Sequence, residues 1–409
     1  MRIVCAPSRA TTVYAGLLVS AGTRHELPDE SGMAHFVEHV TFKGTERRTA
    51  MQIINRMDSV GGELNAFTGK EETVYYSTCM PEHLERALEL LTDIVFHSTF
   101  PQAEVEREVE VVCDEIESYE DTPSELIFDD FESMLFDGHP LGRNILGEAS
   151  RLRQYGSANL QAFARHHYRP DNVVAFVLGN VDIRRVERIL LRHTQDAVPD
   201  SNIATTAPYP TTAPNVPDAL PITTTTAPAP RYVHRGTHQA HVIVGAPAFA
   251  LSDDRYVHLF VLNNILGGPA MNSRLNISLR ERRGLVYTVE SSLTAYSDTG
   301  VWTTYFGCDI ADVQRCLRLV RNELDRLCQS PLSPRQLANA KRQLCGQLAI
   351  ANDNLENKAI GMAKRVALTG RALELDELRQ MVCDVTPMQL LSTAQAVLAP
   401  QVCRTLVFD

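Results

Sequence analysis

The sequence lacks three features that mark large classes of protein: a paired-cysteine motif, an excess of basic residues and a long uncharged apolar run. Its nine cysteines are scattered and include no C-x-x-C pair. This argues against a cysteine zinc cluster or a disulfide framework and indicates reduced thiols. The 39 basic residues are outnumbered by 50 acidic ones, for a net charge of −11. We therefore expect no generic nucleic-acid binding, which needs clustered Lys and Arg.

What remains is the composition of a globular protein. Hydrophobic residues make up 44% and charged residues 22% of the chain, close to globular averages. At roughly 100–200 residues per domain, 409 residues predict two to four domains. The acidic balance favours basic partners, such as basic peptides.

One apolar stretch near the N-terminus, Val13–Gly22, has the length of a signal-peptide core. A strand-like segment precedes it and a helix signature follows closely, so we interpret it as a buried strand. No stretch approaches the roughly 18 apolar residues of a membrane-spanning helix, so we expect no membrane association. With no convincing targeting segment, we expect a cytoplasmic protein.

A segment rich in Thr, Ala and Pro divides the chain into two halves. It covers residues 197–231, has no apolar periodicity and is typical of an extended linker. The predicted domains are therefore 1–196 and 232–409. The first contains a candidate metal site, which makes it the candidate catalytic domain.

The two halves have similar patterns of strands and helices, so we predict two homologous domains. In each, strands near the start are followed by an apolar helical stripe, a Pro-containing break, a long helix and a final strand. Because strands and helices follow one another in this order, we expect the α+β class, with each domain an α/β sandwich. A mostly antiparallel sheet would carry helices on one face. The matching segments are Tyr14–Ser20 and His241–Gly245, Ala103–Tyr119 and Arg335–Ile350, and Val173–Leu178 and Arg404–Phe408.

A short helix is predicted between two capping signals. Ser31 is a plausible N-cap and Gly44 a plausible residue just beyond the C-terminal end. The helix would span Met33–Lys43.

His35, Glu38 and His39 lie on this predicted helix in the order H-x-x-E-H. The two histidines are four residues apart, so their rings project from one face and could bind one tetrahedral metal ion. Glu38 lies on the same side and could act as a general base on a water at the open metal position. A solvated helix face with surface histidines is the alternative.

A third ligand would be an oxygen, and a downstream acidic helix supplies many candidates. Glu108 and Glu115 share one face of it, but seven residues rise about 10.5 Å along a helix. They therefore cannot both bind one ion unless the helix is distorted. One could be a ligand and the other a group that orients the site. Spacing does not choose among the candidates, which are Glu104, Glu106, Glu108, Glu110, Asp114, Glu115 and Glu117.

With these motifs, the sequence resembles the pitrilysin-type inverzincin metallopeptidases, whose relatives include mitochondrial processing peptidase and insulin-degrading enzyme. The resemblance extends over most of the chain outside the Thr/Ala/Pro-rich segment. The matching blocks are His35–Thr45, Gly61–Ala66 with Glu72, Thr73 and Tyr75, His139–Arg143, Tyr168–Asp182, and Leu279–Tyr287.

The resemblance implies roles for acidic residues of the first half. Glu115 would be the third ligand of one zinc ion per chain, beside His35 and His39. Glu108 would be a supporting acidic residue. Glu38 would activate the zinc-bound water.

The resemblance also implies how a peptide substrate is held. Asn65, Ala66 and Phe67 would lie on an edge strand that pairs with the substrate backbone. Arg280 and Tyr287 would reach the substrate carbonyl from the second domain, with Tyr287 stabilising the oxyanion. Each has an alternative: Asn65 as a turn residue, Tyr287 as a buried strand residue, and Arg280 as part of a solvated cluster.

These expectations combine into a zinc-dependent endopeptidase that cleaves unfolded or short peptides. Many members of the family carry four homologous domains, whereas this chain has two. Both the metal motif and the Arg/Tyr pair are present on it, so a homodimer enclosing one chamber is the simpler expectation. The alternatives are a non-catalytic binding or scaffold subunit of a processing-peptidase-like complex, and a metal-dependent hydrolase with a non-peptide substrate.

Overall fold

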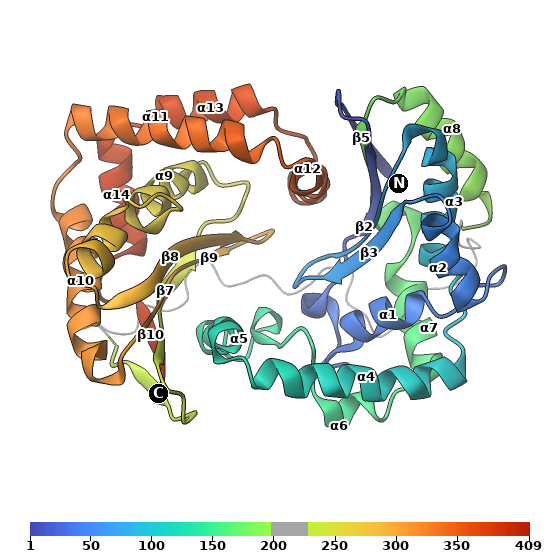
Figure 1. The fold of residues 1–409 in the computed structure, drawn as a ribbon, viewed down its shortest axis with the longest axis horizontal. Coiled ribbons are helices and arrows are strands. Elements are labelled where there is room, and N and C mark those ends of the chain that lie inside the picture. The colour runs from blue at the N-terminus through green and yellow to red at the C-terminus, as the bar shows by residue number, and fades with distance from the viewer. Residues whose placement is uncertain (198–227) are drawn as a thin grey trace. The chain divides into compact units, whose positions relative to one another are not determined.

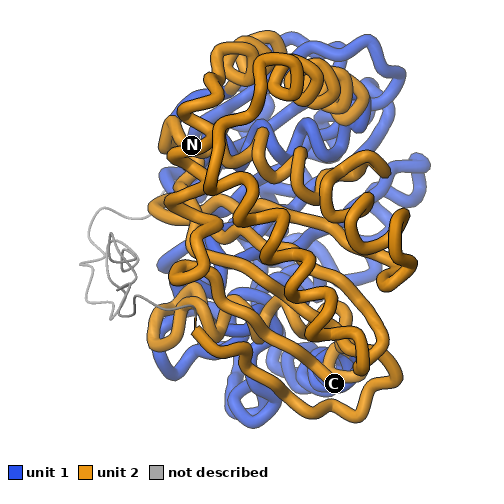
Figure 2. The backbone as a smooth tube through the Cα atoms, turned by 90° about the vertical axis from the view of Figure 1, so that its left-hand side faces the viewer, with its two compact units in different colours: residues 1–118, 143–214, 353–372 blue, residues 119–142, 215–352, 373–409 orange. Residues whose placement is uncertain are grey.

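The computed structural model of the chain describes residues 1–197 and 228–409. Most of the segment predicted as a linker, 197–231, therefore lies outside the described residues. The described residues form two compact units, coloured separately in Figure 2. Among them, no helix combines the length and the apolar character needed to cross a membrane. All nine cysteines are free thiols.

Each unit is assembled from separate stretches of the sequence. Unit 1 comprises residues 1–118, 143–197 and 353–372, and unit 2 comprises residues 119–142, 228–352 and 373–409. The units therefore follow the predicted halves, 1–196 and 232–409, except for two short segments. These segments, 119–142 and 353–372, each belong to the unit built mainly from the other half.

A five-stranded sheet forms the centre of unit 1, in the order β1-β5-β2-β4-β3. β1 and β5 run parallel, and all other neighbours pair antiparallel. The apolar stretch that could have been a signal peptide forms the central strand β2. The strands are β1 (Arg2–Pro7), β2 (Val13–Val19), β3 (Glu63–Thr68), β4 (Thr73–Cys79) and β5 (Val173–Gly179).

Helices cover one face of this sheet and enclose the main core of unit 1. Ala15 and Leu17 of β2 point into this core, where they join the predicted apolar stripe of α3, including Leu88 and Leu91. The helices of unit 1 outside the exchanged segment are α1 (Met33–Thr41), α2 (Ala50–Asp58), α3 (Leu84–His97), α4 (Gln102–Glu120, whose last two residues belong to unit 2), α6 (Ala149–Leu152), α7 (Ser157–His167) and α8 (Ile183–His193).

Unit 2 repeats this architecture. Its sheet has the order β6-β10-β7-β9-β8, with β6 and β10 parallel and the other neighbours antiparallel. The strands are β6 (Arg231–Val233), β7 (Ala240–Ala248), β8 (Val286–Ala295), β9 (Gly300–Cys308) and β10 (Arg404–Phe408). The helices that enclose its main core are α9 (Arg255–Gly267), the π-helix η6 (Asn276–Glu281), α10 (Val313–Gln329), α11 (Pro334–Ala351), α13 (Leu375–Asp384) and α14 (Pro387–Val397).

The second face of each sheet is covered by a helix from the other half of the sequence (Figure 1). Helix α12 (Leu355–Thr369) packs on β5 and β2, where Ala359 and Ala363 contact Leu18 and Phe176. Helix α5 (Pro123–Leu135) packs on β7 and β10. Its Phe131 lies in a core cluster with strand residues of unit 2. Each sheet is therefore buried on both faces, which explains why its central strands are continuously apolar.

The predicted fold class is confirmed. The two sheets have equivalent strand orders, as expected of homologous domains, and three of the four strand pairings in each are antiparallel. The predicted long helices correspond to α4 and α11 within one residue at each end. The sequence pattern did not reveal the helix on the second face of each sheet.

Candidate metal centre

Helix α1 packs one side into the core and carries three predicted functional residues on the other. Phe36 and Val37 are fully buried and fix the helix against the sheet. His35 and His39 are one turn apart, with ring centroids 4.5 Å from each other, and Glu38 lies between them in sequence. A surface location is wrong for His35 and Glu38, since only 7% and 8% of them is exposed.

The N-terminal cap of α1 differs from the prediction. The N-cap residue is Gly32, with φ of +80°, rather than Ser31. The free amide groups of this turn are satisfied by a side chain from outside the helix. Glu26, only 4% exposed, accepts hydrogen bonds from the amides of Gly32 (3.3 Å) and Ala34 (2.9 Å). A buried carboxyl group, whose pKa burial raises to about 8, therefore closes the first turn, which contains His35.

The C-terminal end of α1 also lies earlier than predicted. The helix ends at Thr41, with Phe42 as its C-cap. Gly44, with φ of +155°, lies beyond this cap and forms an isolated β-bridge with Thr49. The glycine thus begins an extended turn rather than closing the helix.

His35, His39 and Glu115 form a cluster of potential metal ligands, with one ligand atom of each within 4.8 Å of the others. Nε2 of His35 lies 3.9 Å from Oε1 of Glu115, and Nε2 of His39 lies 3.4 Å from Oε2. Ligand atoms of a tetrahedral zinc ion with bonds of about 2.0–2.2 Å lie about 3.3–3.6 Å apart. The cluster therefore fits two nitrogen ligands and one oxygen ligand of zinc, and leaves a fourth position open.

Glu108 lies two turns before Glu115 on α4 and contacts the opposite side of the His39 ring. Its Oε1 is 3.2 Å from Nδ1 of His39, and its Oε2 is 2.7 Å from Nζ of Lys43. A carboxylate that accepts from Nδ1 orients the ring and leaves Nε2 available as a metal ligand. Glu108 is only 7% exposed. The geometry therefore puts Glu115 at the cluster and Glu108 behind it.

The electrostatic surroundings shift the pKa values of the two histidines in opposite directions. Burial, with a smaller effect of His39, lowers the pKa of His35 to about 3, so its ring is neutral. Burial acts against protonation of His39 too, but the hydrogen bond to Glu108 and the charges of Glu38, Glu115 and Glu108 raise its pKa overall. A metal ion needs neutral imidazole, so the raised pKa of His39 makes metal binding at this ring more sensitive to acid than at His35.

Glu38 is held in place by a residue of the neighbouring strand. Thr68, at the end of β3, donates a hydrogen bond of 2.8 Å from Oγ1 to Oε2 of Glu38. Burial raises the pKa of Glu38, and Glu115 acts in the same direction, while the Thr68 hydrogen bond and His39 lower it. A carboxyl group with a raised pKa beside an open metal position is suited to general base chemistry.

The predicted substrate-binding residues lie on β3, at the edge of the sheet. Asn65, Ala66 and Phe67 pair with Tyr76, Tyr75 and Val74 of β4, and β3 has no other strand beside it among the described residues. Asn65 is therefore a strand residue, so the alternative of a turn is wrong. Asn65 and Phe67 are exposed, whereas Ala66 faces the core.

Arg280 and Tyr287 lie together in unit 2, whereas the metal-ligand cluster lies in unit 1. Cζ of Arg280, in η6, is 6.0 Å from the ring centroid of Tyr287. Tyr287 is 86% exposed, so the alternative of a buried strand residue is wrong. It lies at a register shift between Val286 and Val289 of the edge strand β8, and such a bulge redirects side chains. The role of this pair toward substrate stays a prediction.

Three residues of the site were not identified from the sequence: Glu26, Lys43 and Thr68. Thr68 could have been found, since it alternates with Leu64 and Ala66 on the inward face of β3. Lys43 lies in the matching block His35–Thr45, but no rule of sequence spacing relates a lysine to a glutamate 65 positions later, here Glu108. Glu26 lies in the loop that precedes α1. Loops have no regular residue spacing, so its contact with the helix could not be predicted from the sequence.

Two family models match consecutive parts of the chain. The model described as Insulinase (Peptidase family M16) matches residues 2–149, which include all the residues of the candidate metal centre. The model described as Peptidase M16 inactive domain matches residues 157–344.

Curated relatives are similar over almost the whole chain. The "Uncharacterized zinc protease YmxG" of Bacillus subtilis is 33% identical over 90% of this chain and 86% of its own length. The "Uncharacterized zinc protease SCO5738" of Streptomyces coelicolor is 32% identical over 94% of this chain and 82% of its own length.

Solved structures show the same fold. A protease from Helicobacter pylori has a TM-score of 0.89 and 21% identity, covering 100% of this chain and 96% of that one. A peptidase M16 inactive domain from Pseudomonas fluorescens has a TM-score of 0.84 and 19% identity, covering 99% and 94%.

Proposed function

Because the chain belongs to peptidase family M16, we propose that it is a zinc-dependent endopeptidase that cleaves unfolded or short peptides. The zinc-protease names of its relatives support a metalloprotease. The observation that carries the finer proposal is the cluster of His35, His39 and Glu115, with Glu38 on the same face of α1. One zinc ion per chain would be held by these three ligands.

When bound, zinc would lower the pKa of a water molecule toward about 7 and polarise the scissile carbonyl. The chain's own part begins with Glu38, which takes a proton from the attacking water. Glu38 then returns this proton to the amine nitrogen as the C–N bond breaks. Thr68 supports this role, since its hydrogen bond to one carboxylate oxygen fixes the direction of the other. Glu108 supports the site by orienting the His39 ring.

The free edge of β3 would bind the substrate backbone as an additional strand. Asn65 and Phe67 offer exposed side chains there, and Ala66 would contribute main-chain groups. Pairing of this kind needs an extended chain, which favours unfolded or short peptides over folded proteins. Arg280 and Tyr287 would bind the substrate carbonyl oxygen, with the Tyr287 hydroxyl stabilising the developing oxyanion.

We also propose that two copies of the chain enclose one chamber and that the enzyme is cytoplasmic. Both the metal-ligand set and the Arg/Tyr pair are present on one chain, so identical copies suffice. The net charge of −11 suits basic peptides, and nine free thiols suit a reducing compartment.

The alternative is a non-catalytic binding or scaffold subunit. The family description that includes the word "inactive" favours it for the second half of the chain. That match begins at residue 157, after His35, Glu38, His39 and Glu115. We therefore assign metal binding and proton transfer to the first half, and to the second half the binding of the substrate carbonyl oxygen by Arg280 and Tyr287.

Cleavage of a quenched fluorescent peptide library by the zinc-loaded protein tests the proposal, with Glu38→Gln as the control. Gln keeps the shape of the side chain but cannot accept the proton. We expect turnover that falls by several orders of magnitude in the variant while zinc content stays the same. Absence of turnover in the zinc-loaded parent, or equal turnover in both proteins, would contradict the proposed function.

A further inference from the structure

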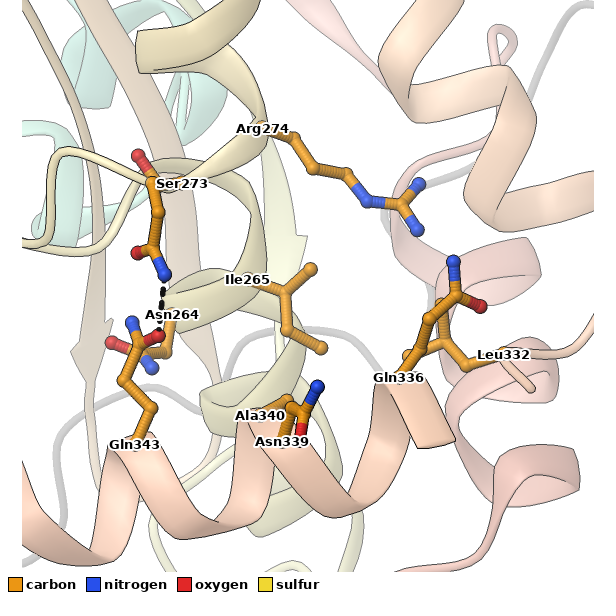
Figure 3. Close-up of a pocket in the computed structure, with 10 residues that line it drawn as sticks. Asn264, Ile265, Ser273, Arg274, Leu332, Gln336, Asn339, Ala340 and Gln343 are labelled. Atoms are coloured by element: carbon orange, nitrogen blue, oxygen red, sulfur yellow. Dashed lines mark hydrogen bonds between the residues drawn. The ribbon is translucent and has the colours of Figure 1, made fainter. Parts of the chain in front are cut away.

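A pocket of about 230 Å³ opens within unit 2, between helix α9, the loop that follows it and helix α11 (Figure 3). It uses none of the residues assigned to peptide cleavage. Its walls are mostly amide side chains, with one guanidinium and a small apolar section. The lining residues are Asn264, Ile265, Asn272, Ser273, Arg274, Leu332, Gln336, Asn339, Ala340 and Gln343.

Arg274 brings a positive charge to this pocket without a partner for it. It lies just before η6, and Figure 3 shows its side chain reaching toward Gln336 and Leu332. Within the described residues its guanidinium makes no hydrogen bond and no ion pair. Burial lowers its pKa, and Arg326 acts in the same direction, with Glu323 opposing. Glu323 is already paired with Arg326 at 2.6 Å, so its charge offsets that of the half-buried Arg274 only in part.

A second unpaired group lies across the pocket. Asn264 of α9 is only 6% exposed, and its side-chain amide makes no hydrogen bond to the described residues. Nearby, Asn272 donates a hydrogen bond of 2.9 Å to Gln343 of α11, drawn as a dashed line in Figure 3. The Asn264 amide is not among the fully buried polar atoms that lack a partner, so its donor and acceptor reach the pocket space. Together with the guanidinium of Arg274, they can bind a ligand in the pocket.

The chemistry of the walls selects the ligand. The single guanidinium of the pocket lining suits a monoanion, and the planar fork of Arg matches a carboxylate. The amides supply both donors and acceptors, as a peptide or acylamino group requires. Ile265, Leu332 and Ala340 provide apolar surface for a short aliphatic chain. A phosphate dianion would lack the second cation that it needs.

From this arrangement, we propose that the pocket around Arg274 and Asn264 binds the carboxylate of a small aliphatic acylamino acid or of a peptide C-terminus. The carboxylate pairs with Arg274, the amide group bonds Asn264 and its neighbours, and the side chain contacts Ile265. The inference does not depend on the proposed peptidase function, since binding is measured without turnover.

Isothermal titration of the full zinc-loaded chain with N-acetyl-L-leucine tests it, at low ionic strength. We expect binding that is at least tenfold tighter than that of the neutral N-acetyl-L-leucinamide or of inorganic phosphate. N-acetyl-Gly-Gly-Leu separates the two sources of the carboxylate. Equal binding supports a site open to peptide termini, and binding of acetyl-leucine alone supports a site for a small molecule.

Two variants locate the site, and a third serves as a control. Arg274→Gln should weaken acetyl-leucine binding at least tenfold. Gln336→Glu should do the same by repulsion, without harm to folding, because residue 336 forms a capping box with Ser333 that Glu also satisfies. Arg335→Gln, an exposed position on the same helix, removes the same charge outside the pocket and should change nothing.

The proposal is overturned if leucinamide binds as well as the acid, or if phosphate binds more tightly. It is also overturned if folded Gln336→Glu binds acetyl-leucine like the parent, or if Arg335→Gln weakens binding as much as Arg274→Gln.

Discussion

The side chain of Glu26 holds the first turn of the metal-ligand helix, and Glu26→Ala should therefore both destabilise the protein and weaken zinc binding. The substitution removes the acceptor of two amide groups, those of Gly32 and Ala34. The Glu26 side chain is almost fully buried, so water cannot replace it without rearrangement. His35 lies in the turn that is set free.

The magnitude follows from these two hydrogen bonds. A buried donor left without an acceptor costs about 1–3 kcal/mol, so the two amides together should cost roughly 2–6 kcal/mol of unfolding free energy. If the first turn is then open part of the time, only the remaining fraction of molecules binds zinc with His35 in place. We expect the apparent zinc affinity to fall at least tenfold, which corresponds to about 1.4 kcal/mol.

Urea denaturation of the zinc-free protein and a competitive zinc titration measure the two effects. The matched control is Ser31→Ala, which alters the residue that the sequence suggested as the cap. It should change the unfolding free energy by less than about 0.5 kcal/mol, as surface substitutions usually do. The assignment of the cap is wrong if Glu26→Ala stays within that range, or if Ser31→Ala is equally destabilising.

Three further predictions address the support of the site and the acid sensitivity of the fold. Glu108→Gln should lower zinc affinity about 10–100-fold in a competitive titration, whereas Glu110→Gln at the surface should not. Equal losses of affinity in both variants would contradict the proposal that Glu108 orients the His39 ring. Thr68→Val should lower kcat of peptide cleavage about tenfold at constant KM and zinc content, and Thr68→Ser should retain the parent value. An unchanged kcat in the Val variant would show that Thr68 does not position Glu38. Burial, with smaller effects of neighbouring charges, lowers the pKa of His167 from 6.5 to about 2, so its contribution to stability is present above pH 6.5 and lost as the pH falls toward 2. Between pH 7.5 and 5 the unfolding free energy should fall by about 2 kcal/mol from this residue; a His167→Phe variant that loses stability just as steeply would refute this.

The local part of the site was predictable and its tertiary part was not. His35, Glu38 and His39 share one helix turn, so the period of the helix alone places them together. The choice between Glu108 and Glu115 depends on which turn of α4 meets α1, and no spacing along α4 contains that information. The family resemblance assigned these two residues their roles, which stay a prediction; in the structure Glu115 contacts Nε2 of His39 and Glu108 contacts its Nδ1.

The exposure of Tyr287 shows a similar limit. Its apolar neighbours Leu285 and Val286 are typical of a buried strand. An edge position and a register shift in β8 turn its side chain outward instead. Both features depend on pairing with β9, which periodicity in a single strand cannot describe.

The same limit on prediction from a single element applies to the fold as a whole. Apolar stripes correctly predicted helices and strands, because a stripe reports that a surface is buried. A stripe does not report which surface covers it. The positions of α5 and α12, each on the sheet built mainly from the other half of the chain, therefore could not be deduced from their own sequences.

This exchange of α5 and α12 has a consequence for synthesis on the ribosome. The sheet of unit 1 is complete in sequence once β5 has emerged, at Gly179, but the helix that covers its second face ends at Thr369. Nascent chains of intermediate length would expose an apolar sheet surface that includes Leu18 and Phe176. At about 5–20 residues per second, this exposure would last on the order of 10–40 s. The first half should therefore depend on chaperones during translation and reach its final structure only near the end of synthesis.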